Sequence, residues 1–142
     1  MESIMMKDML IQSLTKIYYM EAFSQLTEFL QGEQYLLHFL SENLDEELSP
    51  SQLSDNLHMS RPRITATINT LRQKGFVDTI SDIEDRRKQI VSITQEGLDY
   101  IQAKKEKVEE YFLDFVNKLG KEDALEFMRL INKVVENAKE GE

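Results

Sequence analysis

The stretch that decides the fold is residues 48–94, LSPSQLSDNLHMSRPRITATINTLRQKGFVDTISDIEDRRKQIVSIT. Its beginning has the pattern of a capping box, in which the Ser49 hydroxyl accepts from the N–H of Gln52 and the glutamine side chain accepts from the N–H of Ser49. Pro50 stands at the first helical position, where a missing N–H costs nothing. The pattern predicts a two-turn helix that ends near His58.

A second helix follows after a very short turn. Ser60 is placed to cap it, and Ile64, Ile68 and Leu71 define its buried stripe. Gly75 stands where a left-handed residue ends a helix. The opposite face carries polar, basic and small residues, namely Pro62, Ala66, Asn69 and Gln73, flanked by Arg63, Thr65 and Thr70. Two short helices joined by so tight a turn predict a helix-turn-helix.

A hairpin is predicted directly after the second helix. Residues 76–80 and 89–93 are rich in β-branched side chains, as strands are. The loop between them is polar and ends in three cations at residues 86–88. A helix-turn-helix followed by a hairpin with a basic tip is a winged helix.

The order and spacing of four short motifs resemble the MarR family of bacterial transcriptional regulators. They are an L-x-x-L-x-M-S turn, most of which is present from Ser54 to Ser60, Leu71 four residues before Gly75-Phe76-Val77, Asp85-Arg86-Arg87 in the wing, and Ile93-Thr94-x-x-Gly97. The resemblance is clear over residues 30–98. It implies a homodimer that binds a pseudo-palindromic operator in double-stranded DNA. It also implies a repressor that occludes a promoter and that a small-molecule effector can release.

The remainder of the chain is predicted to be helical. Apolar spacing indicates helices over 4–20, with an extension through Leu26, over 32–43, from Thr94 to Gly120, and over 121–138. The fold class is therefore mainly α (α+β). We expect one domain, 1–142, with the winged helix-turn-helix lobe at about 31–97 and dimerisation helices at about 4–28 and 98–140. The apolar residues of the last helix cover too much of its circumference for one domain face, which favours a second copy as their cover.

The charge of the chain is unevenly distributed. The net charge is −9, which is unusual for a DNA-binding protein. Residues 60–90 hold seven Lys or Arg against four Asp or Glu, a local charge of +3, and the rest holds ten against twenty-two, which is −12. The positive charge thus lies where the motif would meet phosphate, and we expect steep salt dependence of binding.

The candidate DNA-binding residues follow from this placement. Arginine pairs with guanine O6 and N7, and asparagine pairs with adenine N6 and N7. A serine at a helix start can contact phosphate. The predicted contacts are Ser60, Arg61, Arg63, Thr65 and Asn69 in the second helix and Arg86, Arg87 and Lys88 in the wing. Asp85 is predicted to organise the wing by pairing with an arginine, because its own charge would repel DNA.

Several other classes of site find little support in the sequence. The chain has no cysteine, which excludes disulfides, thiolate zinc sites and thiol-based sensing. Two distant histidines make a poor metal site. We find no phosphate loop and no nucleophile elbow, so we expect neither an enzyme nor a cofactor. No apolar run is long enough for a membrane span and no signal peptide is evident, so a cytoplasmic protein is expected.

Two questions stay open at the level of sequence. The overall acidity also suits a winged-helix module, such as an anti-regulator, that binds protein and not DNA. The effector site is the second question. Five aromatic residues could line such a pocket or simply belong to the core, and none is assigned to a site: Tyr18, Tyr19, Phe23, Tyr35 and Phe39.

Overall fold

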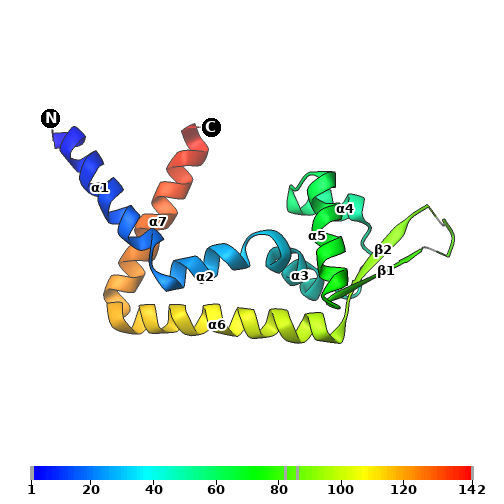
Figure 1. The fold of residues 1–142 in the computed structure, drawn as a ribbon. Helices are drawn as coiled ribbons and strands as arrows, with labels where there is room; N and C mark the ends of the chain where they lie inside the picture. The colour runs from blue at the N-terminus through cyan, green and yellow to red at the C-terminus, as the bar shows by residue number, and fades with distance from the viewer. Residues whose placement is uncertain (1, 82, 86, 142) are drawn as a thin grey trace. The chain divides into compact units, whose positions relative to one another are not determined.

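The computed structural model describes residues 2–81, 83–85 and 87–141. Within them lie seven helices and one two-stranded antiparallel sheet, as the predicted mainly α winged helix requires (Figure 1). The chain forms two compact units, Met1–Val108 and Glu109–Glu142. The elements are α1 Glu2–Tyr18, α2 Glu21–Phe29, α3 Gly32–Glu42, α4 Pro50–Leu57, α5 Arg61–Gln73, β1 Val77–Ser81, β2 Gln89–Ile93, α6 Gln95–Leu119 and α7 Lys121–Gly141.

The helix-turn-helix is formed by α4 and α5 and has the caps that the sequence predicts. Ser49 Oγ accepts from the N–H of Gln52 at 3.2 Å, and Gln52 Oε1 accepts from the N–H of Ser49 at 2.9 Å. At the turn, the Ser54 hydroxyl donates to the carbonyl of Met59, which ties the end of α4 to the start of α5. These local bonds stabilise the start of α4 and the turn into α5.

The first strand begins one residue later than the sequence suggested. The N–H of Phe76 donates to the carbonyl of Leu71 at 2.9 Å, and that of Gly75 donates to the carbonyl of Arg72 at 3.0 Å. This is the hydrogen-bond pattern that ends a helix in a left-handed residue, and Gly75 has φ +81°. Phe76 is therefore part of the helix end, and β1 starts at Val77.

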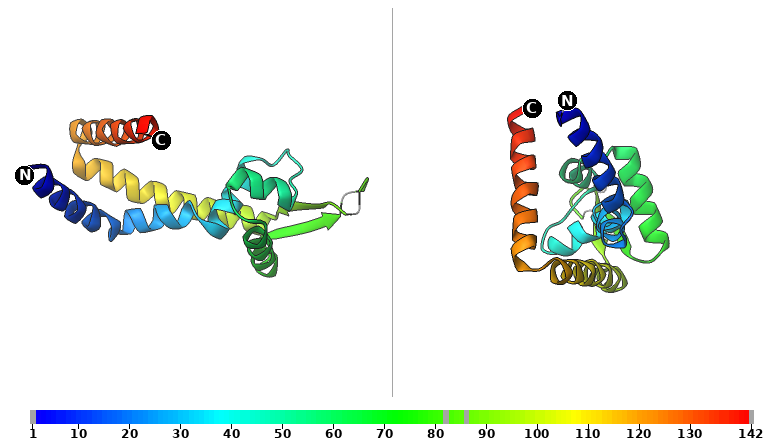
Figure 2. Two further views of the ribbon diagram at one scale, coloured as in Figure 1. Left: turned by 90° about the horizontal axis from the view of Figure 1, so that it is seen from above. Right: turned by 90° about the vertical axis from the view of Figure 1, so that its left-hand side faces the viewer.

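The wing is a regular antiparallel pair with Val77 opposite Ile93 and Thr79 opposite Val91. Val77 and Val91 are buried while Asp78 and Ser92 are exposed, which is the two-residue alternation of a half-buried sheet. An additional bridge from Leu48 to Val91 attaches the segment before α4 to β2. In Figures 1 and 2 the paired strands β1 and β2 extend away from α4 and α5.

One apolar core holds the first unit together. Leu36, Leu37, Leu53, Ile64 and Val77 are fully buried at its centre. Since these residues come from α3, α4, α5 and β1, the same core supports both the helix-turn-helix and the wing. A residue exposed on α5 or β1 is thus held on a packed scaffold.

The first predicted helix is two helices. We expected one helix from residue 4 that could continue through Leu26, but α1 ends at Tyr18 and α2 begins at Glu21. Met20 adopts an extended conformation (φ −73°, ψ 140°), and its N–H donates to the carbonyl of Ile17. The extended residue interrupts the helical hydrogen bonds, and α1 and α2 run in different directions (Figure 2).

The second unit contains the end of α6 and all of α7. Phe115 packs against Phe112 and Phe127 with ring centroids 6.0 and 5.8 Å apart. Ala124 is buried, but most of the apolar side chains of α7 are exposed. No helix among the described residues has the length and apolar character needed to cross a membrane.

Candidate nucleic-acid interface

The start of α5 presents the first group of predicted site residues. Ser60 caps the helix, and its Oγ accepts from the N–H of Arg63 at 3.3 Å. Arg61, Arg63 and Thr65 are exposed on the first two turns. The N-terminus of a helix carries partial positive charge and free N–H groups, so this end of α5 is suited to anions as well as to base edges.

Asn69 lies two turns further along α5 and is also exposed, but its side chain is already engaged. Its Oδ1 accepts from Nη2 of Arg72 at 2.9 Å. The other terminal nitrogen of the same guanidinium, Nη1, donates to the Thr79 hydroxyl at 3.0 Å. Arg72 thus connects α5 to the first strand of the wing. We call Asn69, Arg72 and Thr79 the arginine clamp.

The wing residues lie in the loop between β1 and β2. Asp85 Oδ1 accepts from the backbone N–H of Arg87 at 3.0 Å and lies 3.4 Å from its Nε. The N–H of Lys88 donates to the carbonyl of Asp85 at 3.0 Å, which closes a tight turn. The side chains of Arg87 and Lys88 are exposed. Arg86, the third predicted cation of the wing, lies outside the described residues.

One further cation, Lys74 at the end of α5, forms an ion pair within the protein. Lys74 Nζ forms an ion pair with Glu33 Oε1 at 2.9 Å, which joins the end of α5 to the start of α3. The hydrogen bond from Lys74 to Glu33 raises the pKa of the lysine above its usual value. The lysine stays charged at neutral pH, but the carboxylate beside it balances part of its electrostatic effect.

The structure therefore gathers the predicted residues in two places, the exposed side of α5 and the tip of the wing, both within the first unit. The role of Arg72 was not predicted from the sequence, where it counted only as a charge. The signal was present, because Asn69 and Arg72 are three residues apart on a helix and such pairs are neighbours. Its link to Thr79 depends on how β1 packs against α5, which no local pattern shows.

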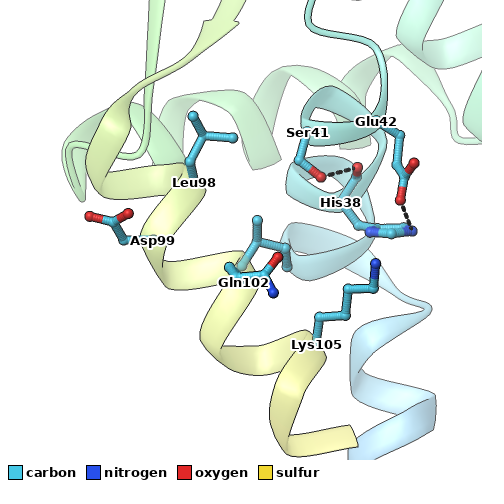
Figure 3. Close-up of a pocket in the computed structure, with 8 residues that line it drawn as sticks. His38, Ser41, Glu42, Leu98, Asp99, Gln102 and Lys105 are labelled. Carbon is cyan, nitrogen blue, oxygen red and sulfur yellow. Dashed lines mark hydrogen bonds and ion pairs between the residues drawn. The ribbon is translucent and has the colours of Figure 1, made fainter. Parts of the chain in front are cut away.

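A second feature of the first unit is a cavity of about 350 Å³ between α3 and the start of α6. It is lined by His38, Ser41, Glu42, Leu98, Asp99, Ile101, Gln102 and Lys105. Figure 3 shows the Ser41 hydroxyl donating to the His38 carbonyl and the His38 ring near Glu42, with Nε2 3.6 Å from Oε1. The lining offers donors and acceptors for a small polar molecule.

The five aromatic residues considered for an effector pocket do not line this cavity. Tyr18 and Tyr19 are exposed at the end of α1 with their rings edge to face, and Tyr35 and Phe39 pack against the core. Within residues 2–81, 83–85 and 87–141, no three His, Asp or Glu side chains come together as a metal site would require.

Comparison with known proteins bears on the same segment. Residues 33–88, which contain nearly all of α3, all of α4, α5 and β1, and end just before β2, match the model of the MarR family. Over these residues the chain is similar to the MarR family. The resemblance stated from the sequence motifs is therefore confirmed.

Two relatives indicate what proteins with this segment do. The transcriptional regulator PapX of Escherichia coli is 36% identical over 67 residues, which are 47% of this chain and 41% of PapX. The transcriptional repressor YetL of Bacillus subtilis is 31% identical over 67 residues, 47% of this chain and 40% of YetL. The matched part is thus less than half the length of either relative.

Solved MarR-type structures share the fold over nearly the whole chain. A mutant of MepR from Staphylococcus aureus superimposes with a TM-score of 0.74 and 16% identity, covering 92% of this chain and 97% of the MepR chain. A complex of MepR with DNA has a TM-score of 0.63 and 16% identity, with 91% and 95% covered. At such identity the similarity establishes the winged-helix fold, including the helices outside the matched segment.

Proposed function

We propose that this protein is a sequence-specific, double-stranded DNA-binding transcriptional regulator. The observation that carries the proposal is the joint placement of exposed Arg61 and Arg63 at the capped start of α5 and of exposed Arg87 and Lys88 at the wing tip. These cations lie in residues 60–90, which carry a local charge of +3, in a chain whose other residues sum to −12. The MarR-family segment and the DNA complex of MepR support the same function.

Each group of residues has a distinct part in the proposed complex. The start of α5 enters the major groove, where Arg61, Arg63 and Thr65 contact base edges or phosphate. Ser60 and the first N–H groups of α5 contact a phosphate. The wing lies against the neighbouring minor groove, whose narrow form concentrates negative potential and attracts Arg87. Asp85 holds the turn that presents this arginine.

The active form is proposed to be a homodimer. All the apolar side chains of α1 except Ile17 are exposed, among them Met9, Leu10 and Leu14, and α7 exposes Leu125, Ile131 and Val134. Apolar surfaces of this extent on a monomer mark sites of association. A two-fold dimer would place two copies of α5 on a pseudo-palindromic operator with half-sites about one helical turn apart.

Repression is the proposed direction of control, in keeping with the relative YetL, which is named a repressor. A dimer that covers two half-sites excludes other proteins from the same DNA. Release by a small-molecule effector would require only that the effector prefer the non-binding form by about 1–3 kcal/mol. The polar cavity between α3 and α6 is the place where we expect it to bind.

Fluorescence anisotropy with purified protein tests the proposal. The probes are the DNA upstream of its own gene and an unrelated duplex of equal length, each titrated at several salt concentrations. The variant Arg87→Ala removes a wing cation, and Lys107→Ala removes an exposed cation from α6 as a matched control. We expect tight binding to one duplex, weakened by Arg87→Ala and unchanged by Lys107→Ala.

The salt dependence separates specific recognition from general attraction. Log affinity should fall linearly with log salt, with a slope of about −0.9 for each phosphate neutralised. Equal affinity for both duplexes, or no binding in the presence and absence of cell extract, would contradict the proposal. A protein-binding module would be the remaining explanation, and it would tolerate charge reversal at Arg63.

A further inference from the structure

The arginine clamp joins Asn69, a predicted DNA contact, to the wing. Arg72 donates from Nη2 to Asn69 Oδ1 at 2.9 Å on the same helix and from Nη1 to Thr79 Oγ1 at 3.0 Å on β1. Thr79 is the central residue of β1 and pairs with the buried Val91 of β2. The guanidinium is thus anchored to a strand that is itself fixed by the core.

The chemistry of the clamp determines the orientation of the Asn69 amide. A guanidinium has only donors, so the atom of Asn69 that faces it must be the oxygen. An asparagine amide without such a partner can turn over and exchange its donor for its acceptor. Hydrogen bonds from a charged donor are stronger than those between neutral groups, so this partner favours the orientation with Oδ1 toward the guanidinium.

We propose that Arg72 is a specificity-determining positioning residue, which acts through Asn69 and uses Thr79 as its anchor. This inference rests on the proposed DNA-binding function. Arg72 fixes which side of the amide donates and which accepts, and Asn69 then discriminates one base pair of the operator. Arg72 itself need not contact a base.

The orientation matters because base edges differ in the order of donors and acceptors. Adenine offers N7 as an acceptor and N6–H as a donor, and asparagine matches both with its N–H and its oxygen. The oxygen has two lone pairs, so Oδ1 can accept from Arg72 and from adenine together. An amide that turns freely would present either order, and the preference for adenine over other bases would be reduced.

A clamp formed before binding also reduces the entropy lost on binding. A free asparagine has several rotamers, and ordering it at an interface costs affinity. The bond from Arg72 selects one of them in the DNA-free protein. The two effects are separable, because entropy changes the affinity for every operator and orientation changes the preference among bases at one position.

The experiment compares base preferences in four variants. The operator selected by the wild-type protein from a random duplex library is substituted with all four bases at each position, and relative affinities are measured by competition. Asn69→Ala identifies the position that Asn69 reads. Arg72→Met removes the donors, and Thr79→Val removes the anchor without changing charge. Lys74→Met is the matched control, since it removes one cation near the same end of α5 without touching Asn69.

The wild-type protein should prefer its base at the Asn69 position by roughly 5- to 150-fold, the range for a good bidentate pair. We expect Arg72→Met to reduce this preference to a value between those of the wild type and of Asn69→Ala, because an amide that turns freely can still contact the base. The double variant Asn69→Ala/Arg72→Met should have the base preference of Asn69→Ala, because Arg72 acts only through Asn69. Thr79→Val should reduce the preference at that position alone, and Lys74→Met should lower affinity equally for all bases.

A second measurement tests the clamp without DNA. In the nuclear magnetic resonance spectrum of the free protein, the side-chain N–H₂ signals of Asn69 should shift in Thr79→Val and in Arg72→Met and stay in place in Lys74→Met. Unchanged signals would overturn the clamp. Unchanged base preference in both clamp variants would overturn its role in specificity, even with the clamp present. If the wild-type protein selected no operator from the library, the proposed function would be refuted, and the inference about Arg72 would be refuted with it.

Discussion

Substitution of Gly97 by alanine should destabilise the protein, although alanine is normally the better helix residue. Gly97 lies in the first turn of α6 and is buried. A Cβ at this position would lie 2.2 Å from the carbonyl oxygen of Phe76 and 2.8 Å from Cγ1 of Ile93. Both distances are far below van der Waals contact, and the nearer atom belongs to the backbone.

The size of the effect follows from what would have to move. The Phe76 carbonyl accepts from the N–H of Thr94 at 3.0 Å, and the Thr94 hydroxyl donates to the Gly75 carbonyl at 2.7 Å and accepts from the N–H of Gly97 at 3.0 Å. Relieving the overlap displaces this cap. Overpacking of this kind costs typically about 1–3 kcal/mol, whereas helix propensity alone would stabilise the variant by about 1 kcal/mol.

Urea unfolding at fixed protein concentration measures the difference. We expect Gly97→Ala to lower the free energy of unfolding by about 1–2 kcal/mol, which is the upper part of the overpacking cost less the gain in helix propensity. This appears as a lower midpoint with an unchanged m-value. Ala103→Gly, at an exposed position of the same helix, is the control for propensity and should lose about 1 kcal/mol. A Gly97→Ala variant as stable as the wild type, or more stable, would refute the close approach of α6 to Phe76.

Three further predictions concern assembly, charge and DNA. Leu14→Glu places a charge on the exposed apolar face of α1, and in light scattering it should convert a dimer into a species with the mass of one chain, whereas Lys16→Glu should remain dimeric. Glu33→Gln should return the raised pKa of Lys74 toward its usual 10.5 in an NMR titration. The stability from this pair is present below that pH and is lost as the pH rises through the raised pKa. If Arg63 contacts a phosphate, Arg63→Ala should reduce the magnitude of the slope of log affinity against log salt by about 0.9. An unchanged slope would mean that Arg63 contacts a base edge or lies away from the DNA.

The elements that the sequence predicted well have their signals in adjacent residues. The capping box of Ser49 and Gln52, the Ser60 cap and the left-handed Gly75 each depend on contacts within five residues, and all are present. Helix ends with such caps are decided locally, so pattern and structure agree. The buried stripe of α5 was likewise predictable, because one face of a short helix must pack on the core.

What the sequence did not predict depends on contacts between elements or lacks a local signal. No glycine or proline marks the end of α1 near Met20. The helical spacing of apolar residues continues past this position, and it therefore predicted one uninterrupted helix. The bond from Arg72 to Thr79 forms only after β1 has packed beside α5. The sequence showed Gly97 only as part of a family motif. Glycine is needed there because a Cβ would lie 2.2 Å from the carbonyl oxygen of Phe76.

The same junction connects the cavity with the surface that we propose binds DNA. Thr94 bonds to Gly75 at the end of α5 and to Gly97 at the start of α6, so α5, the base of the wing and α6 meet at one residue. The cavity lies further along the first turns of α6, at Leu98, Gln102 and Lys105. Its other wall is α3, which Glu33 and Lys74 tie to the far side of the same α5 terminus. A ligand that changed the separation of α3 and α6 would therefore act on both contacts that hold the end of α5, the Thr94–Gly75 hydrogen bond and the Lys74–Glu33 ion pair. We expect such a ligand to alter the position of α5 without unfolding the packed core.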